Sequence, residues 1–149
     1  MLKLPKIDAK DVCFKYHKEF KRLPSGICCV FVPLNAKWGI KTYPYKSTAN
    51  KALRIQKRAY RLGLGPKCGR LLKFYSDGNP IWGFVTRRAT LVNITVDYDS
   101  LRDQFVSNSK QYTELFDMLK KNRFPVWDLH TGNIGTIDGK LVCIDFVAD

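Results

Sequence analysis

The feature that most constrains the fold is one helical pattern set between pairs of short apolar runs. In residues 48–62, apolar side chains recur at helical spacing and basic side chains occupy the other face. The apolar positions are Ala52, Ile55, Ala59 and Leu62. Thr48 is the expected N-cap, Gly63 is the expected C-cap, and Pro66 prevents the helix from continuing. This order predicts an α+β fold that begins with a small antiparallel sheet and one helix.

The expected strands around this helix form two pairs. They are residues 27–32, 38–43, 70–75 and 81–86. Each run is rich in apolar residues and is bounded by residues that favour turns. Residues 33–37 and 77–80 are the expected turns within each pair. Antiparallel hairpins are therefore the simplest arrangement.

The second half of the sequence predicts one more helix and one more hairpin. Residues 109–122 have an amphipathic pattern that Pro125 ends. The apolar face of this helix contains Tyr112, Leu115, Phe116 and Leu119. Residues 133–137 and 140–145 are apolar runs joined by Asp138-Gly139, a pair that suits a tight type I′ turn.

Positive charge is concentrated in the first half of the chain. There are 26 Lys and Arg residues against 13 Asp and Glu, a net charge of +13, and no acid occurs between Glu19 and Asp77. The thirteen bases of this stretch are Lys21, Arg22, Lys37, Lys41, Lys46, Lys51, Arg54, Lys57, Arg58, Arg61, Lys67, Arg70 and Lys73. Such a field favours nucleic acid, nucleotide phosphates or an acidic protein surface as partner. A solvated face that maintains solubility is the alternative.

The cysteines and the apolar runs predict a cytoplasmic protein without a membrane span. The five cysteines include no CxxC pair, so they are interpreted as reduced and mostly buried thiols. No apolar run approaches the roughly 18–20 residues that a transmembrane helix needs. The N-terminus leads into charged residues, so no secretory signal is expected.

Three oxygen-bearing side chains near the C-terminal end are the main candidates for chemistry. Asp128 and Asn133 lie in the loop before the expected hairpin, and Asp145 ends its second strand. Because a hairpin returns to its starting point, Asn133 and Asp145 are expected to lie together, with Asp128 nearby. An amide oxygen and a carboxylate beside phosphates form a magnesium site. A further carboxylate there can accept or orient the proton of an attacking hydroxyl.

These residues resemble a known motif. Asp128-x-x-x-x-Asn133 followed by Asp145-Phe146 resembles the catalytic loop and metal-binding motif of the protein-kinase-like superfamily. The form Asp-Leu-His-x-Gly-Asn looks closer to aminoglycoside phosphotransferases, choline kinases and RIO-type kinases than to typical eukaryotic protein kinases. Ile40-Lys41 resembles the strand whose lysine contacts nucleotide phosphates. Gly63-Leu64-Gly65-Pro66 resembles the segment that follows the helix in that superfamily.

The resemblance implies a role for each matched residue. Asp128 would be the catalytic base, and Asn133 and Asp145 would be ligands of Mg²⁺. Lys41 would contact the phosphates of ATP. The other implied nucleotide-binding residues are Gly26 in the phosphate-covering loop, Gln56 on the helix, and Thr86 and Arg88 near the hinge that holds adenine.

The resemblance also divides the chain into a nucleotide-binding part, residues 1–88, and a truncated C-terminal part, residues 89–149, with a helix, the catalytic loop and the metal-binding hairpin. Gln56 occupies the position where the superfamily has a Glu paired with the lysine, and it can accept a hydrogen bond from Lys41. The chain ends four residues after Asp145, so a minimal, a degenerate and a partial kinase are all compatible with the sequence.

Two functions follow as hypotheses. The first is an ATP- and Mg²⁺-dependent phosphotransferase that acts on a hydroxyl of a protein or a small molecule. The alternative is a kinase-like binding protein with weak or absent catalysis. Such a protein would engage nucleic acid or an acidic protein partner through its basic first half.

Overall fold

The computed structural model describes residues 3–6, 30–76, 78–91, 109–125 and 133–145. Within these residues the chain forms two compact units. Unit 1 contains the residues up to Lys57 together with Lys67–Arg88, and unit 2 contains Arg58–Pro66 and the residues from Ala89 on. One change of unit falls between Arg88 and Ala89. The last turn of the helix formed by residues 46–61 and the segment after it belong to unit 2.

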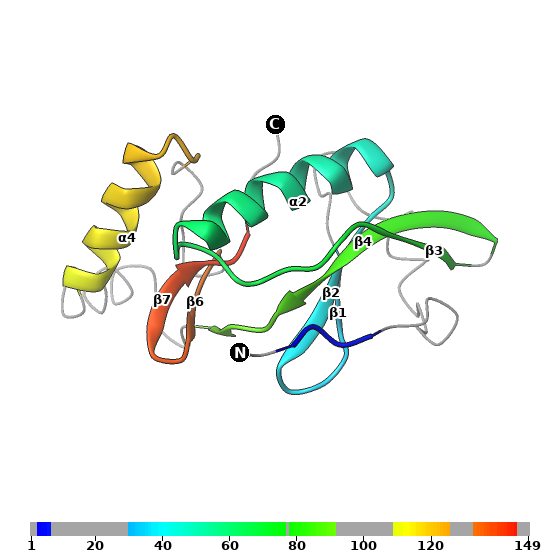
Figure 1. Ribbon diagram of the computed structural model, residues 1–149, viewed down its shortest axis with the longest axis horizontal. Coiled ribbons are helices and arrows are strands. Elements are labelled where there is room, and N and C mark those ends of the chain that lie inside the picture. The colour runs from blue at the N-terminus through cyan, green and yellow to red at the C-terminus, as the bar shows by residue number, and fades with distance from the viewer. Residues whose placement is uncertain (1–2, 7–29, 77, 92–108, 126–132, 146–149) are drawn as a thin grey trace, which may run out of the picture. The chain divides into compact units, whose positions relative to one another are not determined.

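Unit 1 is built on a four-stranded antiparallel sheet (Figure 1). Its strands are β1 (Val30–Pro33), β2 (Trp38–Tyr43), β3 (Leu72–Ser76) and β4 (Asn79–Arg87), in the order β1-β2-β4-β3. The β1–β2 and β3–β4 hairpins confirm the two expected pairs. β4 begins at Asn79, earlier than expected, because Asn79 pairs with Ser76 at the end of β3. Residue 77 of the expected turn lies outside the described residues. Residues 27–29 of the first expected strand lie outside the described residues.

Side-chain alternation gives this sheet two apolar faces. Trp38 and Ile40 of β2 pack with Val85 of β4 in one core. Tyr43 of β2 and Phe84 of β4 point to the opposite face and form a second core with helix α2. Odd-numbered residues of β2 and even-numbered residues of β4 therefore share the face that α2 covers.

Helix α2 spans Lys46–Arg61. The carbonyl of Tyr45 accepts the first helical hydrogen bond from the N–H of Ala49, so Tyr45 is the N-cap. The expectation that Thr48 caps the helix was wrong, because Thr48 lies inside the first turn. The expected end is confirmed: the final backbone hydrogen bonds close a Schellman motif around Gly63, whose φ is +73°.

The buried face of α2 is rotated from the face that the apolar spacing predicted. Its buried residues are Ala49, Ala52, Leu53, Gln56 and Ala59. Ile55 is only half-buried, and Leu62 is 41% exposed beyond the end of the helix. Apolar spacing alone misplaced the face because a polar residue, Gln56, lies at its centre.

Unit 2 contains a three-stranded sheet and helix α4 (Figure 1). Its elements are β5 (Thr90–Leu91), α4 (Ser109–Lys121), β6 (Ile134–Ile137) and β7 (Lys140–Cys143), with strand order β5-β6-β7. The expected hairpin is confirmed, and φ values of +51° at Asp138 and +77° at Gly139 fit the type I′ turn. The sequence pattern gave no strand at β5, which is only two residues long and pairs with β6.

Helix α4 presents the apolar face that the sequence predicted. Leu115 and Leu119 are buried, and the half-buried rings of Tyr112 and Phe116 stack with centroids 6.4 Å apart. The helix ends in a second Schellman motif, around Arg123, whose φ of +63° is usually adopted by glycine. In the part of the chain that the structure describes, no helix has both the length and the apolar character needed to cross a membrane.

Candidate functional site

Lys41 is a buried cation on an inner strand of the unit 1 sheet. Its position on β2 directs its side chain to the face that α2 covers. The residue is 8% exposed, and its Nζ donates a hydrogen bond of 2.9 Å to Oε1 of Gln56. A buried ammonium group needs such an acceptor, because burial removes its water. The hydrogen bond that the sequence predicts from Lys41 to Gln56 is therefore present.

Gln56 in turn contacts Thr86. Nε2 of Gln56 donates a hydrogen bond of 2.7 Å to Oγ1 of Thr86, and both residues are buried, at 1% and 2% exposure. The Thr86 hydroxyl donates at 3.4 Å to the carbonyl of Arg87. The resemblance implies that Thr86 lies near the hinge that would hold adenine, and it gives no indication of the contact with Gln56. Strand alternation could have predicted that Thr86 faces α2, because Thr86 lies on the same face of β4 as Phe84, which packs against α2.

Arg88, the other residue expected near the hinge that would hold adenine, lies against the β1–β2 turn. Its guanidinium donates a hydrogen bond of 2.6 Å to the carbonyl of Asn35 and lies 6.0 Å from the ring centroid of Phe31. Its backbone N–H donates to the carbonyl of Lys37. These contacts give Arg88 a structural role in holding that turn to the end of β4.

The β6–β7 hairpin brings Asn133 and Asp145 to the same end of the unit 2 sheet. The N–H of Ile144 donates a hydrogen bond of 2.8 Å to the carbonyl of Asn133, so Asp145 directly follows the residue that faces Asn133. The Asn133 side chain is buried and Asp145 is exposed. The thiol of Cys143 donates to the carbonyl of Asp145 at 3.3 Å. This contact fixes the backbone where β7 ends.

Asn133 offers an amide oxygen and Asp145 offers carboxylate oxygens, which are ligand types that Mg²⁺ accepts. Mg²⁺ prefers hard oxygen ligands and is often held by one or two protein carboxylates together with substrate phosphates. Among the described residues, no group of three or more His, Cys, Asp or Glu is placed to hold a metal ion by itself. Gly26 and Asp128, the expected loop glycine and catalytic base, lie outside the described residues.

The two cysteines within the described ranges, Cys68 and Cys143, are buried free thiols, as the sequence predicted for most of them. Burial raises the pKa of Cys68 from an ordinary 9.0 to about 11, and the positive charges of Lys57 and Lys41 oppose part of that rise. Cys68 therefore stays protonated at neutral pH and is a poor nucleophile there.

The exposed face of α2 is basic. Lys51, Arg54 and Arg61 are exposed on it, and the helix contains no Asp or Glu. Arg58 has a different role, because its guanidinium bonds to a backbone carbonyl beyond the end of α4 and lies 3.9 Å from the ring centroid of Phe124. The three exposed bases form a surface that suits a negatively charged partner.

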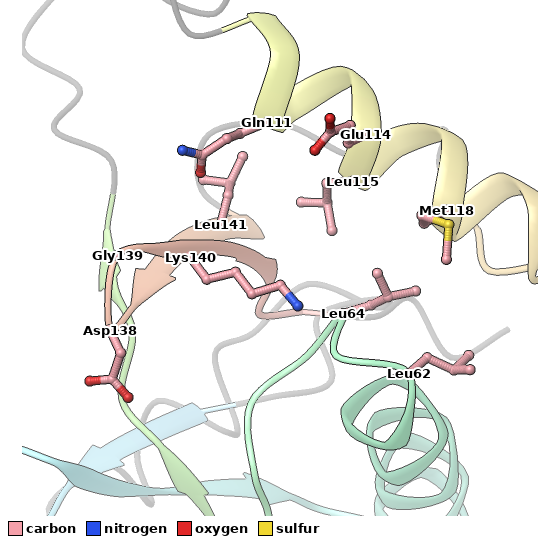
Figure 2. Close-up of a pocket in the computed structure, with 10 residues that line it drawn as sticks. All are labelled: Leu62, Leu64, Gln111, Glu114, Leu115, Met118, Asp138, Gly139, Lys140 and Leu141. Atoms are coloured by element: carbon pink, nitrogen blue, oxygen red, sulfur yellow. The ribbon is translucent and has the colours of Figure 1, made fainter.

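A groove of about 490 Å³ lies in unit 2, between the turn after α2, helix α4 and the β6–β7 turn (Figure 2). Leu64, Leu115 and Met118 form apolar walls, and Glu114 and Lys140 contribute opposite charges. Among the described residues, none to which the resemblance assigns a nucleotide-binding, metal-binding or catalytic role lines this groove. It is therefore a different feature from the site that the kinase resemblance predicts.

Comparison with known proteins does not place the chain in a family. No family model matches it, and neither a curated protein nor a solved structure gives a significant match. What the chain does has to be inferred from its own residues and their contacts.

Proposed function

We propose that the protein is a kinase-like phosphotransferase that uses ATP and Mg²⁺ to phosphorylate a hydroxyl of a protein or a small molecule. The observation that carries the proposal is the buried hydrogen bond from Lys41 to Gln56. Burying an ammonium group is unfavourable, so a lysine held in a core marks a candidate functional site. The helix residue that holds it stands at the position where the resemblance requires a partner for the nucleotide-binding lysine.

The proposal assigns a distinct task to each unit. In unit 1, the Lys41 ammonium would donate charge-assisted hydrogen bonds to phosphate oxygens of ATP. In unit 2, Asn133 and Asp145 would hold Mg²⁺, which supplies neutralisation of the phosphate charge. These tasks are the ones that phosphoryl transfer requires of a protein, since positioning and charge stabilisation supply most of its catalysis.

The remaining task belongs to Asp128. The acceptor oxygen would attack the γ-phosphorus while the bond from that phosphorus to the bridging oxygen of ADP breaks. The proton of the acceptor hydroxyl would pass to the Asp128 carboxylate, and ADP would leave.

Transfer of label from γ-labelled ATP tests this proposal. The wild-type chain with Mg²⁺ should transfer label to itself or to a small-molecule or protein acceptor. Asp145→Asn and Lys41→Met should reduce transfer by at least about a hundredfold, in line with the loss of a metal ligand or a phosphate contact. Asp138→Asn is the matched control, because Asp138 is an exposed carboxylate in the β6–β7 turn, where asparagine also fits. Label transfer that is equal in wild type and Asp145→Asn would contradict the proposal.

The basic face of α2 favours a second candidate function, binding of nucleic acid or an acidic protein. Lys51, Arg54 and Arg61 are exposed on one helix that carries no acid. Polyanion binding through such a face releases counterions, so it weakens steeply as salt rises.

A salt titration of oligonucleotide binding tests this second candidate. Log K falls as log salt rises, so the slope is negative. Replacing Lys51, Arg54 and Arg61 together by Gln should make this slope shallower by about 2–3, which corresponds to the lost phosphate contacts. Replacing Lys110, Lys120 and Lys121 of α4 by Gln is the control and should leave the slope nearly unchanged. No binding of the wild type at low salt would remove nucleic acid and leave only the acidic protein.

A further inference from the structure

Three residues of unit 1 form a hydrogen-bond relay that runs in one direction. Lys41 Nζ donates to Gln56 Oε1 at 2.9 Å, Gln56 Nε2 donates to Thr86 Oγ1 at 2.7 Å, and Thr86 Oγ1 donates to the carbonyl of Arg87 at 3.4 Å. The relay joins β2, α2 and β4, and its three side chains are buried.

The direction of the relay follows from the chemistry of its members. An ammonium group only donates hydrogen bonds, whereas a glutamine amide has one accepting end and one donating end. If the amide of Gln56 turned over, its NH₂ group would face the Lys41 ammonium. The donor-only Lys41 ammonium disfavours that orientation, and the Thr86 hydroxyl adds to the preference, because its oxygen accepts from Nε2 of Gln56 while its proton is directed to the Arg87 carbonyl.

We propose that Thr86 is a positioning residue that fixes the orientation of the Gln56 amide and so holds the Lys41 ammonium for a phosphate ligand. This inference rests on the proposed nucleotide-binding role of Lys41. It extends that role by naming a residue that acts through Gln56 and needs no contact with the nucleotide.

The requirement for Thr86 depends on position 56 being an amide. A glutamate there would offer Lys41 two equivalent accepting oxygens, so its orientation would need no hydroxyl to select it. Thr86 and Gln56 therefore act as a pair, and loss of the hydroxyl should matter much less when residue 56 is a glutamate. A purely structural role for Thr86 would give no such dependence.

The test is a double-mutant cycle with dissociation constants for Mg·ATP measured by calorimetry. Thr86→Val should weaken binding about tenfold in the Gln56 protein, because it removes the hydroxyl that accepts the hydrogen bond from Nε2 of Gln56. Thr86→Ser, which keeps the hydroxyl, should restore binding to within about twofold of the wild type. In a Gln56→Glu background, Thr86→Val should change binding by less than about threefold. Equal losses in both backgrounds, or no loss in the first, would overturn the positioning role. If Thr86→Val does not fold, Thr86→Ala removes the same hydroxyl and takes its place in the cycle.

A second readout separates this inference from the proposed function. The side-chain NH₂ signals of Gln56, observed by NMR without nucleotide, should shift in Thr86→Val and return in Thr86→Ser. If the wild type binds no Mg·ATP while these signals behave as expected, the proposed function fails and the orienting contact stands. If the signals are identical in Thr86→Val and wild type, the positioning role fails whatever the nucleotide affinity.

Discussion

Replacement of Gly83 by alanine tests how closely the strands that carry Lys41 and Thr86 approach each other. Gly83 lies on β4 and pairs with Thr42 of β2. A Cβ atom at this position would stand 2.2 Å from the carbonyl oxygen of Lys41. Gly83 does not have a positive φ, so close approach of the backbones, and not a special conformation, is what excludes a side chain.

The expected loss of stability follows from this geometry. Cβ atoms essentially never approach other heavy atoms closer than 3.0 Å, so the two strands would have to separate by most of an ångström. Overpacking of this kind costs about 1–3 kcal/mol. Alanine also restricts the unfolded chain, which offsets about 0.4–1 kcal/mol. Gly83→Ala should therefore lower the free energy of unfolding by about 1–2 kcal/mol.

Gly69→Ala is the matched control in the same unit. Its Cβ would meet nothing closer than 3.8 Å, so we expect no loss and a gain of up to about 1 kcal/mol. The assay is urea unfolding followed by tryptophan fluorescence, with midpoints compared at a shared slope. If Gly83→Ala unfolds at the same urea concentration as Gly69→Ala, the close contact between β2 and β4 is refuted.

Three further changes test local features. Arg123→Gly should raise the free energy of unfolding by about 0.5–1 kcal/mol, because glycine adopts the φ of +63° at the end of α4 without steric strain. Arg123→Ala keeps a Cβ atom and should give no such gain in urea unfolding. Gly139→Ala should cost about 1 kcal/mol of stability. The cost comes from the φ of +77° alone, because a Cβ atom there meets no atom within 4 Å. A melting temperature equal to that of wild type would contradict this. Burial raises the pKa of Cys68 from 9.0 to about 11, so the folded state favours the protonated thiol. The contribution of this thiol to stability is complete below pH 9 and is lost as the pH rises toward 11. The difference in unfolding free energy between wild type and Cys68→Ala should therefore shrink over that interval, and a constant difference would contradict the burial of the thiol.

The parts of the fold that the sequence predicted correctly depend on local signals. Gly63 ends α2 because only a residue that tolerates positive φ completes its Schellman motif easily. Asp138-Gly139 fixes the type I′ turn, and that turn sets the register that places Asn133 opposite Ile144. The neighbourhood of Asn133 and Asp145 could therefore be predicted from residues adjacent in the chain.

The parts that the sequence did not predict depend on contacts between distant residues. The buried face of α2 is centred on Gln56, and only its partners on β2 and β4 make burial of an amide acceptable. The Schellman motif that ends α4 could not be predicted from a glycine, because its residue of positive φ is Arg123. The resemblance implies only that Thr86 lies near the hinge that would hold adenine, and the hydrogen bond between its hydroxyl and Gln56, thirty positions earlier, has no local signal in the sequence.

Binding of Mg·ATP by the purified chain, measured by titration calorimetry, is the most direct test of the central claim that Lys41 holds a nucleotide phosphate. Wild type and Lys37→Met, which alters an exposed lysine of the β1–β2 turn, should bind with similar affinity. Lys41→Met should bind at least about tenfold more weakly, because it removes a charge-assisted phosphate contact. Equal affinity of Lys41→Met and wild type for Mg·ATP would contradict the claim.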